Sequence, residues 1–136
     1  MSAGGRVLRP AVADGDRHVF VLPPGIDSVR IVSRVAVPAH AEPWKEDRRR
    51  LGVMMRRITA AGPDGPGDIP LDHPGLGAGW WDAETDGASL WRWTRGAAVL
   101  PLPPGTRLLE LWIDRRSLRY AHESAPDAAQ RVQAAA

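Results

Sequence analysis

Hydrophobic and polar side chains alternate along several short stretches of this chain. The clearest stretch is residues 29–37, where Val29, Ile31, Val35 and Val37 alternate with Arg30 and Arg34. A period of two is typical of a strand with one buried and one wetted face. Residues 17–22 and 51–59 predict two further strands. Proline and glycine in residues 23–27 predict a turn, because proline lacks a ladder donor and glycine accepts positive φ.

The second half of the chain repeats this pattern. Residues 89–94 and 97–102 predict a β-hairpin about Arg95-Gly96, since glycine tolerates the geometry of a tight turn. Residues 107–113 predict a strand. Its core-facing side chains are Leu109, Leu111 and Ile113, with Glu110 and Trp112 on the other face. The glycine- and proline-rich residues 61–68 predict a turn or loop.

Many short strands, frequent turn signals and no long amphipathic helix predict an all-β fold. We expect an antiparallel β-sandwich or jelly roll of about eight strands, with short or no helices. A chain of 136 residues can bury one core. Residues 1–4 are expected to form a flexible N-terminus and 5–122 a single β-sandwich domain. Residues 123–136 carry few apolar groups and are expected to form a flexible or short helical tail.

Composition excludes several classes of function. The chain has no cysteine, which excludes disulfides, thiolate zinc sites and cysteine nucleophiles. Basic residues number 18 and acidic residues 16, and the one basic run, Arg48-Arg49-Arg50, follows Glu46 and Asp47. We therefore expect no nucleic-acid partner. No signal peptide and no membrane-spanning apolar run are recognisable, so we expect a soluble protein, cytoplasmic by default, with non-classical secretion left open.

Tryptophan is concentrated in one segment. Four of the six tryptophans lie between residues 80 and 93, although the chain has one Phe and one Tyr. Small cores use tryptophan sparingly, so the cluster indicates either a corner that locks the fold or an aromatic ligand surface. Strand alternation predicts that Trp91 and Trp93 are structural and pack against the opposite sheet. Trp80 and Trp81 are consecutive, so one is expected in the core and the other as an exposed platform.

A sugar ring stacks on an indole face while its hydroxyl groups bind nearby polar side chains. The predicted ligand-binding residues are therefore Trp80, Trp81, Asp82, Glu84 and Arg92, with Trp112 on an outer face. We also hypothesise that one arginine of residues 48–50 ties its loop to a carboxylate in the corner formed by residues 80–84.

Evidence for catalysis is thinner. Asp72, His73, Asp82 and Glu84 include carboxylates and an imidazole that could serve acid–base chemistry or a metal. Their spacing matches no metal-ligand motif, and no nucleophile elbow or nucleotide loop is recognisable. We expect no catalytic residues, no metal and no cofactor. A carboxylate-based hydrolase is the alternative.

The order of motifs resembles an accessory domain that follows bacterial Hint (hedgehog/intein-type) self-processing modules. The resemblance covers about residues 5–115. It rests on residues 23–25, 32–38, 47–53, 71–80 and 91–94. Gly79-Trp80, Glu84, residues 92–94 and residues 100–102 are more loosely similar to β-rich modules attached to bacterial glycosyltransferases. In the family, Thr-Asp-Gly is usual where this chain has Thr94-Arg95-Gly96, which puts a cation or sugar site that used that acid in doubt.

The resemblance implies an accessory role, because no Hint nucleophile or histidine block is recognisable in this chain. We expect a non-catalytic recognition module that binds a glycan or a partner protein through its tryptophan-rich edge. The alternative is a structural domain that packs beside a Hint module or self-associates.

Overall fold

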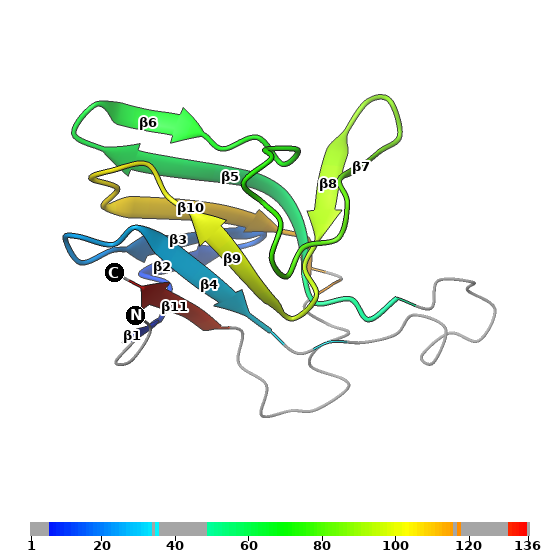
Figure 1. Cartoon of the computed structure of the whole chain (residues 1–136), viewed down its shortest axis with the longest axis horizontal. Helices are drawn as coiled ribbons and strands as arrows, with labels where there is room; N and C mark the ends of the chain where they lie inside the picture. Colours follow the sequence, from blue (N-terminus) through cyan, green and yellow to red (C-terminus); the bar gives the residue numbers. More distant parts are fainter. Residues whose placement is uncertain (1–5, 34, 36–48, 116, 118–130, 136) are drawn as a thin grey trace.

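The computed structural model describes residues 6–33, 35, 49–115, 117 and 131–135. These residues form eleven β-strands in two antiparallel sheets (Figure 1). The prediction of an all-β fold is confirmed, with more strands than the eight expected. The finer assignment to a sandwich or jelly roll stays a prediction, and residues 1–4 lie outside the described part.

One sheet has four strands in the order β1-β11-β4-β9. Their bounds are β1 Arg6–Leu8, β4 Ser28–Val32, β9 Ala97–Pro101 and β11 Arg131–Ala135. Strand β4 pairs with β9 on one side and with β11 on the other. The strand predicted for residues 29–37 therefore ends at Val32, and most of its remainder lies outside the described residues.

The other sheet has seven strands, in the order β2-β3-β10-β5-β8-β7, with β6 also paired to β5. Their bounds are β2 Val12–Asp14, β3 Arg17–Val21, β5 Met54–Gly62, β6 Gly65–Asp68, β7 Glu84–Thr85, β8 Leu90–Trp93 and β10 Leu108–Ile113. Strands β7 and β8 stand at one end of the molecule, on the right of Figure 1.

Side chains from both sheets form one hydrophobic core. The seven-stranded sheet contributes Phe20, Met55, Ile58, Leu109, Leu111 and Ile113, and the four-stranded sheet Val29, Ile31, Ala98 and Leu100. The predicted facing of β10 is confirmed, because its three core residues are fully buried while Glu110 and Trp112 are partly exposed. We call the side of the seven-stranded sheet that carries Glu110 and Trp112 its outer face.

The predicted hairpin about Arg95-Gly96 is wrong, because β8 and β9 belong to different sheets. The chain crosses from one sheet to the other at these residues. Gly96 has φ of 105°, and its carbonyl accepts a hydrogen bond from the backbone N–H of Ser33, which directly follows β4 of the four-stranded sheet. This long-range bond holds the crossing, which local turn propensity does not reveal.

Two segments predicted to be irregular contain strands. Within 61–68, residues 63 and 64 form the expected turn, but Gly65–Asp68 is β6 and pairs with β5. Within 123–136, the described residues Arg131–Ala135 form β11 between β1 and β4. A strand with partners on both edges satisfies its backbone without an alternating apolar pattern, so composition alone did not reveal it.

Candidate recognition surface

Trp80 belongs to the core. Its exposed fraction is 3%, its backbone bridges Thr94, and its indole Nε1 donates a 2.8 Å hydrogen bond to the carbonyl of Val99. Gly79, with φ of 82°, turns the chain tightly against Ala97 just before it. As predicted, one of the two consecutive tryptophans is core, so Trp80 offers no surface to a ligand.

Arg92 is also buried, contrary to its predicted role beside a surface ligand. Its exposed fraction is 9%, and its guanidinium donates hydrogen bonds to the carbonyls of Trp81 and Leu71, the latter at 2.9 Å. The guanidinium carbon also lies 5.8 Å from the ring centre of Trp80. Arg92 therefore ties the loops at residues 71 and 80–81 to β8, and its donors are committed within the protein.

The burial of Arg92 reverses the predicted facing of β8. Trp91 and Trp93 lie on either side of it in the strand, so they point to the outer face, and both are partly exposed. The prediction that they pack in the core is wrong. Side chains of β8 do alternate between two faces, as predicted. The buried face holds Arg92 instead of the tryptophans, because two carbonyls satisfy the hydrogen-bond donors of its guanidinium there.

Trp81 joins these two tryptophans on the outer face. In the register of β5 and β8, buried Met55 lies opposite Arg92, and partly exposed Met54 lies opposite Trp93. The backbone N–H of Trp81 donates a 2.9 Å hydrogen bond to the carbonyl of Trp93 from the other side. We define the tryptophan face as Trp81, Trp91, Trp93 and Met54, all partly exposed.

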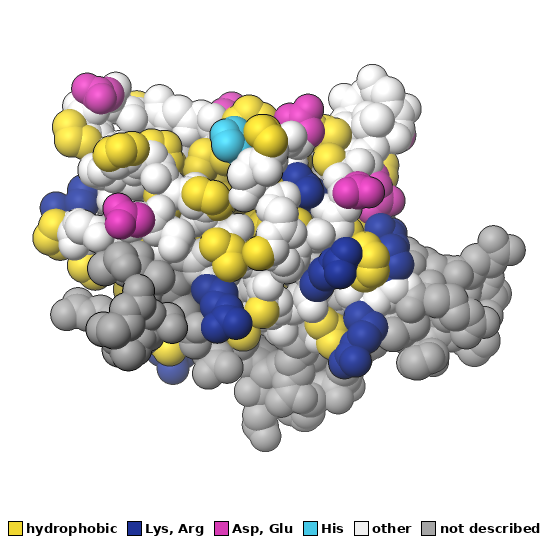
Figure 2. Space-filling model, in the orientation of Figure 1, with side chains coloured by type: hydrophobic (Ala, Val, Ile, Leu, Met, Phe, Trp, Pro, Cys, Tyr) yellow, Lys and Arg dark blue, Asp and Glu magenta, His cyan; other side chains and the backbone are white. Residues whose placement is uncertain are grey.

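Arginine side chains surround Trp81. The guanidinium carbon of Arg95 lies 4.0 Å from its ring centre, and that of Arg49 lies 5.6 Å away. The indole Nε1 of Trp81 donates a 3.0 Å hydrogen bond to the carbonyl of Arg50. Figure 2 shows, on its right near β7 and β8, dark-blue arginines around exposed hydrophobic surface. Stacked guanidinium groups are held by the electron-rich ring face.

The hypothesis that one arginine of residues 48–50 reaches the corner is confirmed by Arg49. Its Nη1 lies 3.1 Å from Oε2 of Glu84, which lies opposite Trp91 in the register of β7 and β8. Arg48 lies outside the described residues. Asp82, by contrast, is exposed. Of the predicted ligand-binding residues, the structure thus brings Trp81 and Glu84 together around Arg49.

Of the residues considered for acid–base chemistry, Glu84 lies at this corner, and His73 is bonded within its own loop. His73 accepts a 2.9 Å hydrogen bond at Nδ1 from the backbone N–H of Gly75, within its own loop. Within the described ranges, no three histidine or acidic side chains are placed to share a metal ion.

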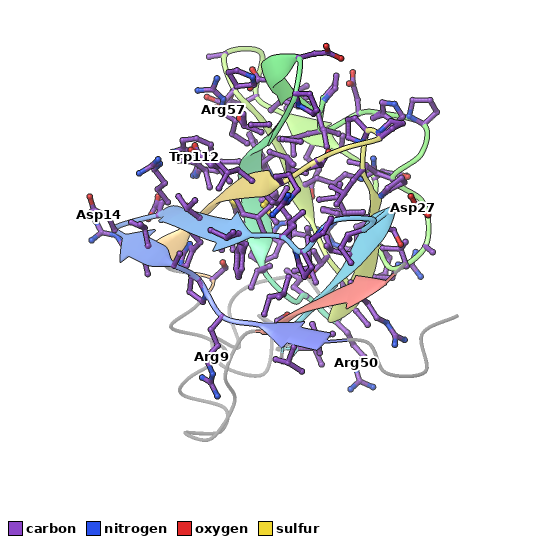
Figure 3. The ribbon with its side chains drawn as sticks, turned by 90° about the vertical axis from the view of Figure 1, so that its left-hand side faces the viewer. Arg9, Asp14, Asp27, Arg50, Arg57 and Trp112 are labelled. Atoms are coloured by element: carbon purple, nitrogen blue, oxygen red, sulfur yellow. The ribbon has the colours of Figure 1, made fainter. Side chains whose placement is uncertain are left out.

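Trp112 lies on the outer face of β10, apart from the tryptophan face. Figure 3 shows it beside Arg57 on the same side of the sheet, and the Arg57 guanidinium carbon lies 5.1 Å from its ring centre. Arg57 is itself held by the carboxylate of Asp68 on β6, at 3.0 Å. A stacked arginine therefore covers part of the ring that was predicted to bind a ligand.

Replacing Thr59 by valine is expected to raise the pKa of Asp68. Hydrogen bonds from Thr59 and Arg57 lower this pKa from its usual 3.8. A lowered folded-state pKa favours folding above the unfolded-state value, and that contribution is lost as the pH falls through the folded-state value. NMR titration of Thr59→Val should show the pKa of Asp68 rising toward 3.8.

Asp86 is the internal control in the same titration. Backbone N–H groups of Ser89 and Ala88 lower its pKa, so Thr59→Val should leave it unchanged. An unchanged pKa of Asp68, or equal changes in the pKa of Asp68 and Asp86, would contradict the assignment of Thr59 as the main cause of the lowered pKa of Asp68.

Sequence reasoning missed Met54, Arg95 and the outward facing of Trp91 and Trp93. The one available signal was Arg95 itself, a basic residue between a threonine and a glycine directly after the tryptophan strand. Its stacking partner Trp81 lies fourteen positions earlier and meets it only through the pairing of residues 79–81 with 93–95.

Comparison with protein-family models, with curated proteins and with solved structures finds no match to this chain. The resemblance to a Hint-associated domain therefore stays a prediction. In the part of the chain that the structure describes, no helix has the length and apolar character needed to cross a membrane.

Proposed function

We propose that this domain is a non-catalytic recognition module that binds a partner protein through its tryptophan face. The observation that carries the proposal is the gathering of Trp81, Trp91 and Trp93, all partly exposed, on one side of a sheet end. Tryptophan, methionine and arginine are the residue types enriched at protein interfaces, and tryptophan and arginine dominate their binding energy.

A protein surface fits this geometry better than a glycan. A sugar needs an open indole face, and Arg95 lies across the ring of Trp81. A sugar also needs uncommitted polar groups beside the ring. Of the three predicted ones, Arg92 is bound to two carbonyls, Glu84 is paired with Arg49, and Asp82 alone is exposed. Flat aromatic surface with arginines at its margin instead suits a packed protein contact.

The non-catalytic part of the proposal is supported by the engagement of the titratable residues. Glu84 holds Arg49, Asp68 holds Arg57, and His73 holds its own loop. These bonds hold strands or loops in place, so a structural role accounts for all three side chains. Asp72 and Asp82, the other two acids considered, are exposed.

The test is selection of peptides from a random phage-displayed library on the immobilised full chain. We expect selected peptides, made synthetically, to bind the wild-type protein and to lose at least about tenfold in affinity on Trp93→Ala. Trp93 is the better probe than Trp81, because its indole makes no described hydrogen bond. Binding is measured by isothermal titration calorimetry.

Trp112→Ala is the matched control, since Trp112 is a partly exposed tryptophan on the same outer face but outside the tryptophan face. It should bind the selected peptides like the wild type. Peptides that respond equally to both variants, or a tryptophan fluorescence change with soluble polysaccharides alone, would overturn the proposal. A concentration-dependent dimer dissolved by Trp93→Ala would replace it with the assembly role.

A further inference from the structure

The arginines beside Trp81 carry more positive charge than the neighbouring carboxylates balance. Among the residues that the structure describes, four arginines, Arg49, Arg50, Arg92 and Arg95, lie at this corner with two acids, Asp82 and Glu84. Of the acids, Glu84 pairs with Arg49. Among the described residues, the excess of positive charge is therefore concentrated around one partly exposed tryptophan, Trp81.

Arg92 contributes to this excess from below the surface. Its guanidinium is bound by carbonyl oxygens and by a ring face, and among the described residues no carboxylate pairs with it. Carbonyl dipoles satisfy its donors without cancelling its charge. A buried charge is screened less by solvent than an exposed one, so it strengthens the positive field at the corner above it.

Arg95 is organised in advance to bind a carboxylate. It is exposed, and its stacking on Trp81 at 4.0 Å restrains the guanidinium. Within the described ranges, no carboxylate pairs with it. A stacked guanidinium keeps its in-plane N–H groups available, and these match the two oxygens of a carboxylate. Restraint before binding lowers the entropy that binding costs.

Arg50 provides a second cation near the indole. Its carbonyl accepts the hydrogen bond from Trp81 Nε1, which anchors its backbone to the ring. Its side chain is exposed and points away from the body of the molecule in Figure 3. The backbone of Arg50 therefore lies at the Nε1 edge of the indole, and Arg95 stacks on the face of the same ring.

We propose that the partner presents an acidic segment whose carboxylates bind Arg95, stacked on Trp81, and Arg50, whose backbone is anchored to the same indole. This inference rests on the proposed function and names the chemistry of the partner. A long polyanion such as a nucleic acid fits less well, because a phosphate chain needs a continuous track of uncommitted basic side chains. Beyond the corner, Arg17, Arg56 and Arg57 are each paired with a carboxylate, of Glu110, Asp114 and Asp68 respectively.

The test uses synthetic peptides of one length built around a central tract of glutamate, with glutamine replacing every glutamate in the matched peptide. Intrinsic tryptophan fluorescence reports binding to the full chain. We expect the glutamate peptide to bind, its affinity to fall as salt is added, and the glutamine peptide to bind at least about tenfold more weakly.

Arg95→Gln should weaken the glutamate peptide about tenfold. Arg9→Gln removes the same charge from an exposed arginine elsewhere, which points away from the body in Figure 3, and should leave binding unchanged. Equal losses of affinity in Arg95→Gln and Arg9→Gln would show only a general electrostatic attraction to the peptide and would overturn the inference. So would tighter binding of a single-stranded oligonucleotide or a phosphoserine peptide than of the glutamate peptide.

The outcomes separate this inference from the proposed function. Library-selected peptides that need Trp93 but carry no excess of acidic residues would sustain the recognition role and overturn the acidic partner. Glutamate peptides that bind through Arg95 but are indifferent to Trp93→Ala would sustain the carboxylate site and overturn the role of the tryptophan face.

Discussion

Gly79→Ala is expected to lower the free energy of unfolding by more than about 3 kcal/mol. Two effects combine at this position. The backbone has φ of 82°, which alanine adopts only with strain. A Cβ atom would also overlap the carbonyl oxygen of Ala97 and lie 2.6 Å from its carbon. Backbone atoms in a strand cannot move aside as a flexible side chain can, so the 79–81 segment must leave its place on β9.

Urea denaturation followed by tryptophan fluorescence measures this effect, and two glycines separate its causes. Gly87 has φ of 92° with nothing within 4 Å, so Gly87→Ala should show the conformational strain alone, about 1 to 2 kcal/mol. Gly67 has neither feature, and Gly67→Ala should change little. Equal losses for Gly79 and Gly87 would show that the close approach to Ala97 contributes nothing.

Arg92→Leu is expected to lower the free energy of unfolding by about 2 to 4 kcal/mol, although leucine is the more hydrophobic residue. The leucine side chain fits a buried position but leaves the carbonyls of Trp81 and Leu71 without donors. Unpaired buried carbonyls cost more than the extra apolar contact contributes. Arg92→Lys should retain part of the stability, because one ammonium cannot reproduce the fork that spans both carbonyls.

Urea denaturation again provides the measurement, with Arg57→Leu as the matched control on the neighbouring strand. Arg57 has a side-chain exposure of 57% and an exposed partner, so its loss should leave stability nearly unchanged. An Arg92→Leu protein as stable as the wild type would show that water replaces the lost donors. An equal fall in the free energy of unfolding for Arg92→Leu and Arg57→Leu would indicate that the loss of a positive charge is the cause.

Strands could be predicted where apolar and polar residues alternate within one short segment. The facing of β10 follows from three apolar residues at alternate positions, and no distant contact changes it. Strand β8 has the same alternation, yet its facing was predicted the wrong way round. Tryptophan outranks arginine in hydrophobicity, but Arg92 finds two carbonyls from distant loops in the interior, and sequence does not show those loops converging.

The sequence indicated which residue types form the candidate surface, but it did not indicate how their side chains are arranged. The run of tryptophans correctly drew attention to residues 80–93, and opposite facing of consecutive residues correctly divided Trp80 from Trp81. The stacking of Arg95 on Trp81 depends on the pairing across Thr94, and the crossing between sheets at Gly96 depends on a bond to Ser33. Contacts of this kind join residues far apart in the chain and leave no local pattern.

The place of β11 sets the order in which this molecule can be completed during synthesis. Residues 131–135 lie between β1 and β4, so β1 has no neighbour in its sheet until more than a hundred further residues have left the ribosome. Until then the edge of β4 that β11 will cover presents unpaired backbone groups, which can pair with another chain. Pairing β11 with β1 also slows folding, because the chain between them loses conformational entropy before the contacts of β11 form. The seven-stranded sheet, whose strands all lie between residues 12 and 113, can assemble first.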